Sequence, residues 1–207
     1  MKPWLFDILA CPIDKFFPLE LFIFSLETSS EDIQSFVNIY KNRDIKVIND
    51  EEIINIYNEE GGQYYRDNIV IQKQKLEEYL ELIISSIDEL EYINDNSPNK
   101  LITKCFDILK TEIKEKIIKF SKNQEVKQFN QILPELYLLN KFKLEIEIKS
   151  GILFCKKCGR WYPIIETIPQ MLPDNYRDKK EEIEFLKNNK NLLNKEFFNQ
   201  DLKPFNI

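Results

Sequence analysis

The chain has 207 residues, 43% of them hydrophobic, which is enough to build the core of one or two domains. It contains no histidine, which excludes imidazole acid–base catalysis, Ser-His-Asp triads and histidine-containing metal motifs. Its net charge of −6 excludes a general attraction to nucleic acid, and its four glycines favour helices over turn-rich β structure.

The N-terminal segment predicts a short helix followed by a strand. Apolar side chains recur on one side of residues 3–10, and Pro12 prevents a helix from continuing past Cys11. Residues 16–24 then alternate between apolar and polar positions, the pattern of a half-buried strand.

In residues 29–141 the apolar residues recur at helical spacing, which predicts a helical region. Ser29 can cap a helix, and a second helix is predicted after residues 50–52, followed by a turn at Gly61-Gly62. Apolar stripes predict further helices at the following positions: about 71–92, 101–118 and within 124–140.

From Phe142 the apolar period changes to two, which predicts a strand that turns at Ser150-Gly151. Further strands are expected at 152–154 and 161–165, on either side of Cys155-Lys-Lys-Cys158. Prolines bracket residues 168–173, so this segment cannot lie at the centre of a sheet, and a charged helix is expected around 177–193.

The predicted fold class is α+β, with a small β core, a large all-helical insertion and a helical C-terminal tail; the cysteine motifs and the resemblance described next imply that the core is zinc-ribbon-like. The expected divisions are as follows: 1–28 and 142–173 as the two halves of the core, 29–141 as the insertion, and 174–207 as the tail.

Two short motifs predict a metal site. Cys155 and Cys158 form a C-x2-C turn that points two thiolates at one centre, and Cys11 with Asp14 offers the same spacing as C-x2-D. Zinc accepts carboxylate oxygen as well as thiolate, so these four residues form a chemically admissible ligand set. The alternative is a metal-free cluster of small apolar thiols. Cys105, on an apolar helix face, is interpreted as a buried free thiol.

These motifs resemble those of a known family. Residues 5–12, the C-x2-C turn, Tyr162-Pro163-Ile164 and residues 168–172 are similar to the zinc-ribbon activator subunit of S-adenosylmethionine-dependent methyltransferases that modify tRNA, rRNA and translation release factors. The chain departs from the four-cysteine members at Asp14, and the region between its two halves is much longer than in the short members.

The resemblance implies a non-catalytic subunit that forms a heterodimer with a class I methyltransferase, binds zinc and contacts nucleic acid only through its partner. It further implies a partner-binding face, which we expect to contain Trp4, Leu5, Ile168, Pro169, Met171 and Leu172. For Met171 and Leu172, closure of the protein's own core is an equal alternative; for Ile8 and Ile164 a core position is favoured. The acidic and basic side chains alternate as on solvated helix surfaces, and we expect no enzyme activity.

Two other functions remain open. Lys156, Lys157 and Arg160 beside Trp161 and Tyr162 form the basic and aromatic mixture of a nucleic-acid-binding zinc ribbon. Alternatively, the acidic insertion is the working part of a helical adaptor. The sequence has no run of 18 apolar residues, no signal sequence and no secreted disulfide pattern, so we expect a cytoplasmic protein without membrane contact.

Overall fold

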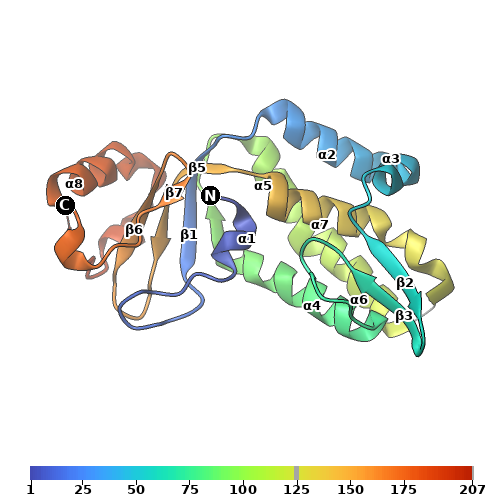
Figure 1. Ribbon diagram of the computed structural model, residues 1–207. Helices are drawn as coiled ribbons and strands as arrows, with labels where there is room; N and C mark the ends of the chain where they lie inside the picture. Colours follow the sequence, from blue (N-terminus) through green and yellow to red (C-terminus); the bar gives the residue numbers. More distant parts are fainter. Residues whose placement is uncertain (124–125, 207) are drawn as a thin grey trace. The chain divides into compact units, whose positions relative to one another are not determined.

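A computed structural model describes residues 1–123 and 126–206. The chain divides into two compact units, each built from segments that are far apart in the sequence (Figure 1). The first, here called the sheet unit, comprises Met1–Glu27, Tyr92–Lys100 and Glu147–Ile207. The second, the helical unit, comprises Thr28–Glu91 and Leu101–Ile146.

The sheet unit is built on a five-stranded sheet in the order β4-β1-β5-β6-β7. The β1–β4 pair is parallel and the other neighbouring pairs are antiparallel. In the pair formed by β1 and β5, Phe22 lies opposite Ile152; in the pair formed by β5 and β6, Phe154 lies opposite Trp161. The strands have these bounds: β1 Glu20–Leu26, β4 Ile93–Asp95, β5 Ile148–Phe154, β6 Trp161–Ile165 and β7 Ile168–Pro169.

The strands from both ends of the chain do pair, as predicted, but several local expectations are wrong. Ser150-Gly151 is not a turn; both residues lie inside β5. A Cβ at Gly151 would lie 2.5 Å from the Phe22 carbonyl oxygen, so glycine is required because strand β1 approaches there. The first helix, α1, covers only Pro3–Phe6, and β1 begins four residues later than predicted, at Glu20.

The C-terminal tail is helical, as predicted, and belongs to the sheet unit. Its longest helix, α8, begins after Asp178, whose side chain accepts hydrogen bonds from the Lys180 and Glu181 amides. The tail contains η4 Asp174–Tyr176, α8 Lys179–Asn188, η5 Lys190–Leu192 and α9 Lys195–Phe198.

The helical unit packs around one helix, α7 (Leu133–Glu145), most of whose side chains are buried, polar ones included. Its buried Glu135 accepts hydrogen bonds from Arg43 and Lys116, each at 2.9 Å. The surrounding helical elements are α2 Ser30–Asn42, α3 Ile45–Asp50, α4 Leu76–Asp88, η1 Glu89–Tyr92, α5 Lys100–Ile108, η2 Leu109–Ile113, α6 Lys114–Asn123 and η3 Val126–Gln131. Ser29 caps α2 as predicted, accepting a hydrogen bond from the Asp32 amide at 3.1 Å.

Helix α7 overturns the predicted strand start at Phe142. The residues up to Glu145 are helical, and Phe142 packs edge-on against Phe106 with ring centroids 4.6 Å apart. The apparent alternation fails because Lys143, at a polar position of the expected strand, is buried as well. The predicted helix within 124–140 partly covers residues 124 and 125, which lie outside the described residues; its remainder forms η3 and most of α7.

The insertion is also not all-helical. In place of the helix expected after residue 52, strands β2 (Asn55–Glu59) and β3 (Gly62–Arg66) form a hairpin. The predicted turn at Gly61-Gly62 joins them, and both glycines have positive φ angles of 102° and 125°. Cross-strand pairing of Tyr57 with Tyr64 favours the strand over the helical alternative.

Candidate metal centre

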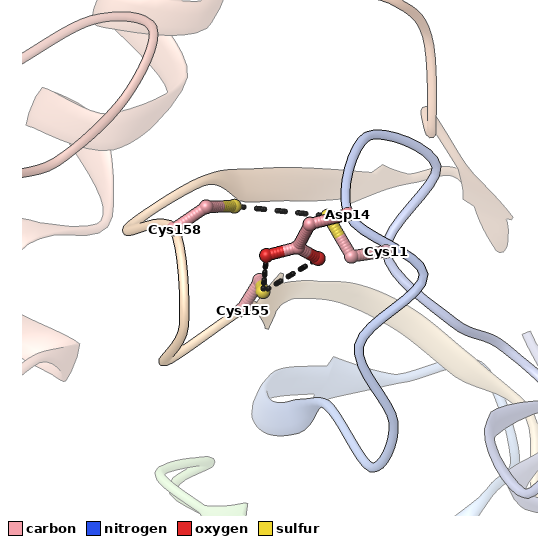
Figure 2. A group of neighbouring side chains, drawn as sticks. All are labelled: Cys11, Asp14, Cys155 and Cys158. Atoms are coloured by element: carbon pink, nitrogen blue, oxygen red, sulfur yellow. Dashed lines mark hydrogen bonds between the residues drawn. The ribbon is translucent and has the colours of Figure 1, made fainter.

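Two loops of the sheet unit bring the four predicted ligands together (Figure 2). Cys11 and Asp14 lie on the loop between α1 and β1, and Cys155 and Cys158 lie on the loop between β5 and β6. The nearest ligand atoms of all four side chains lie within 4.8 Å of one another. Cys11 and Cys155 are fully buried, whereas Cys158 and Asp14 are half-buried. The structure therefore joins every residue that the two motifs predicted as a ligand.

The two loops share one backbone design. In the first, the Cys11 carbonyl accepts a hydrogen bond from the Lys15 amide at 2.9 Å, and the Cys11 amide donates to the Phe16 carbonyl at 3.0 Å. In the second, the Cys155 carbonyl accepts from the Gly159 amide at 2.9 Å, and the Cys155 amide donates to the Arg160 carbonyl at 2.8 Å.

The fifth residue of each loop is left-handed, with φ of 58° at Lys15 and 72° at Gly159. Asp14 thus occupies in the first loop the position that Cys158 occupies in the second. The Asp14 carboxylate therefore lies where it could bind the same ion as Cys158.

Two of the six separations between ligand atoms match those around a tetrahedral zinc ion, and all six are no longer than 4.8 Å. Zn–S bonds of about 2.3 Å and Zn–O bonds of about 2.1 Å require S···S edges of about 3.8 Å and S···O edges of about 3.6 Å. The Cys11 and Cys158 sulfurs are 3.7 Å apart, and the Cys155 sulfur is 3.6 and 3.8 Å from the two Asp14 oxygens. The residues present therefore suit a metal with this geometry and this preference for sulfur.

The protonation of the thiols depends on whether a cation is bound. Burial raises the pKa of the Cys155 thiol to about 12, so this sulfur stays protonated at neutral pH unless a cation stabilises its thiolate. Burial also acts against the Cys158 thiolate, but hydrogen bonds from the Arg160 backbone and side chain hold the pKa of Cys158 below its ordinary value. For Asp14, the Phe16 amide and two thiols outweigh desolvation and lower the pKa.

Residues around the ligands complete the site. The Tyr162 hydroxyl lies 3.3 Å from the Cys11 sulfur, and burial first, then this thiol, raises the pKa of Tyr162. Of the basic residues beside the ligands, Lys156 forms an ion pair with Glu20 at 2.6 Å, while Arg160 forms hydrogen bonds with Asp174. The Tyr162 contact was not predicted; its only signal in the sequence is a phenol four residues after Cys158.

The residues expected at a partner face divide into exposed and half-buried ones. Trp4 is 42% exposed, Ile168 60% and Leu172 42%, whereas Leu5, Pro169 and Met171 are half-buried. Ile164 is buried, as predicted, on the sheet face opposite Trp161. The core position expected for Ile8 is wrong, because α1 ends at Phe6 and leaves Ile8 66% exposed.

The two aromatic residues of the nucleic-acid hypothesis are not accessible to a base. Trp161 and Tyr162 are fully buried, and the Arg177 guanidinium lies over both rings at 5.3 and 5.2 Å. Neither ring can stack on a base in this conformation. Cys105 is a buried free thiol, as interpreted from the sequence, and burial raises its pKa to about 12.

The fold and site define a class: a small mixed sheet whose two cysteine-containing loops close around one cation-sized centre, joined to a helical insertion. A family model described as "Trm112p-like protein" matches residues 2–166, and the chain belongs to this family of methyltransferase activators. A comparison with curated proteins gives no match. Among residues 1–123 and 126–206, no helix has both the length and the apolarity needed to cross a membrane.

Proposed function

We propose that this protein is a non-catalytic, cytoplasmic subunit that binds and activates class I S-adenosylmethionine-dependent methyltransferases acting on tRNA, rRNA or a translation release factor. The observation that carries the proposal is the family match over residues 2–166. It includes both ligand loops and strands β1, β5 and β6, so the match covers the part of the chain that forms the metal centre.

The edge of the sheet supports a partner-binding role. Strand β7 is the last strand on its side of the sheet. Just past its end, the Gln170 amide donates a hydrogen bond to the Pro163 carbonyl of strand β6 at 2.8 Å. The chain continues through Met171 and Leu172 without joining a strand. An apolar sheet edge of this kind can be extended by a strand of another protein, which adds backbone hydrogen bonds and side-chain contacts.

A second apolar segment of the sheet unit strengthens the proposal. Trp4 and Ile8 are both exposed at the N-terminal segment, which is tied to β5 by a hydrogen bond from the Ile148 amide to the Met1 carbonyl at 2.8 Å. Tryptophan is one of the usual anchors of protein interfaces, and methionine is also enriched in them. We propose that Trp4, Leu5, Ile168, Pro169, Met171 and Leu172 contact the methyltransferase.

We further propose that Cys11, Asp14, Cys155 and Cys158 hold zinc in a structural role. Four protein ligands leave no open position for a substrate or an activated water. Bound zinc would supply a cross-link between the N-terminal loop and the β5–β6 loop. The exposed N-terminal segment and strand β6, which pairs with β7, would thereby be held in fixed positions.

Activation would follow from mass action. A subunit that binds only the folded methyltransferase stabilises it by about 2.7 kcal/mol when present at 100 times its dissociation constant. Covering an apolar surface would also favour whichever enzyme conformation presents that surface, and reciprocal linkage would favour cofactor binding if that conformation binds the cofactor.

Affinity purification of the tagged chain from its native cells, followed by mass spectrometry, tests this function. The expected result is a near-stoichiometric methyltransferase, lost in Met171→Asp because an unpaired charge would be buried at the interface. Leu82→Asp is the matched control, since Leu82 is 46% exposed in the helical unit. A normally folded Met171→Asp protein that retains the methyltransferase at wild-type yield would show that the proposed face is wrong.

A further inference from the structure

The C-terminal segment, residues 174–206, lies beyond the part matched by the family model and packs on the sheet unit. Figure 1 shows it in red beside strands β5 to β7. Its side chains complete an apolar cluster with one face of the sheet. The sheet contributes Phe22, Phe24, Ile152, Phe154 and Trp161, and the C-terminal segment contributes Leu186, Leu193, Phe197 and Leu202.

Phe197 is the centre of this packing. Its ring lies edge-on to Phe22 at 5.3 Å and edge-on to Phe154 at 5.4 Å. Strand β5 ends at Phe154, immediately before the ligand Cys155. The C-terminal segment therefore packs directly against the strand that leads into the second ligand loop.

The end of the segment also bonds to that loop through the backbone. The Lys203 amide donates to the Gly159 carbonyl at 2.8 Å, and the Trp161 amide donates to the Lys203 carbonyl at 3.1 Å. The Trp161 indole N–H donates to the Phe205 carbonyl at 2.9 Å. At Gly159 an added Cβ would lie 2.2 Å from the Asp201 carbonyl oxygen. Residues 201–203 thus contact the loop at Gly159, one residue after the proposed ligand Cys158.

Ion pairs attach the beginning of the segment to the same place. Arg160 donates to both Asp174 oxygens, with distances of 2.8 to 3.1 Å. The buried Arg177 donates to the Trp161 carbonyl at 2.7 Å and pairs with Glu182. Residues 159–161 are thus held from both ends of the C-terminal segment.

We propose that this segment, which we call the C-terminal clamp (residues 174–206), retains the metal by holding the Cys155–Arg160 loop closed. The proposal rests on the zinc site proposed above. A metal leaves a four-ligand site by losing its ligands one at a time, and the half-buried Cys158 is the thiol with the easiest access to solvent. Movement of Cys158 requires Gly159 to move, and the hydrogen bond from Lys203 opposes that movement.

Lys203→Pro in the full-length zinc-loaded protein tests this idea, because it removes the amide that donates to Gly159. Lys203→Ala is the matched control: it keeps the amide and removes only an exposed side chain. The zinc transfer rate to the chelator 4-(2-pyridylazo)resorcinol is expected to rise about five- to tenfold in Lys203→Pro, and to stay within about twofold in Lys203→Ala. Hydrogen exchange of the Trp161 amide reports clamp detachment independently. Truncation after Leu202 serves as a second detaching variant.

Each outcome is decisive. Wild-type zinc release from a variant whose Trp161 amide exchanges rapidly would overturn the clamp proposal while leaving the zinc site intact. Equal acceleration in Lys203→Ala would also overturn it. If neither detaching variant folds, the segment is required for folding and is not a retention device. If the wild-type protein binds no zinc, the proposed metal site itself fails, and metal retention fails with it.

Discussion

The two ligand loops have the same hydrogen-bonding pattern but differ in the residue at the fourth position and in the residue at the left-handed fifth position. The first has Asp14 where the second has Cys158, and Lys15 where the second has Gly159. The second loop is also covered by the C-terminal clamp, which leaves no room for a Cβ at its fifth residue. The comparison shows that one backbone pattern is compatible with a different residue at the candidate ligand position and at the turn.

The largest effect is expected from removing a thiolate that both loops enclose. Cys155→Ser should lower the zinc content of the purified protein from near one per chain to well below it, measured by elemental analysis, and should lower the melting temperature. Cys105→Ala is the control, because Cys105 is buried in the helical unit and its loss should leave the zinc content unchanged. Equal thermal stability of wild-type protein with and without chelator would argue against a structural metal.

Next in size is a change at the fifth residue of the clamped loop. Gly159→Ala should destabilise the sheet unit by about 2–4 kcal/mol, because alanine is strained at positive φ and its Cβ would collide with the Asp201 carbonyl. Chemical denaturation followed by tryptophan fluorescence measures this. A loss below about 0.5 kcal/mol would mean that the clamp does not pack on Gly159 as closely as described.

The fourth ligand should respond in opposite directions to two substitutions. Asp14→Asn should weaken zinc binding about 10- to 100-fold in a competition titration, because it removes the negative charge of one ligand. Asp14→Cys should restore or tighten binding, because the backbone at this position matches that at Cys158. Unchanged affinity in both variants would show that residue 14 is not a ligand.

The smallest effect is expected at the fifth residue of the unclamped loop. Lys15→Gly should change stability by no more than about 1 kcal/mol, and in the stabilising direction, because glycine adopts the φ of 58° without strain. Thermal unfolding of the zinc-loaded protein measures the difference. Destabilisation comparable to that of Gly159→Ala would contradict the proposed difference between the loops.

The metal centre could be predicted from the sequence because its signal is local. C-x2-C is a short motif with one geometric meaning, and it drew attention to the same spacing at Cys11 and Asp14. The pairing of the terminal strands was predicted from the change of apolar period at both ends of the helical region, and β1 and β5 do pair.

The rest required tertiary information. Gly151 reads as a turn residue in the sequence, yet it lies inside β5 because the Phe22 carbonyl approaches it. Phe142 fits a period of two over a few residues, but α7 buries polar residues such as Asn140 and Lys143 along with its apolar ones, so the sequence shows no separate polar face that would reveal its helical period. The contact between Lys203 and Gly159 joins residues that no motif connects, so the clamp had no signal in the sequence beyond a charged helix.

Zinc K-edge X-ray absorption spectroscopy of the purified protein tests most directly whether the two loops share one metal. Three sulfurs at about 2.3 Å and one oxygen at about 2.0–2.2 Å are expected, from Cys11, Cys155, Cys158 and Asp14. In Asp14→Cys the same spectrum should fit four sulfurs. A wild-type spectrum with fewer than three sulfurs, or one that does not change in Asp14→Cys, would contradict a site built from both loops.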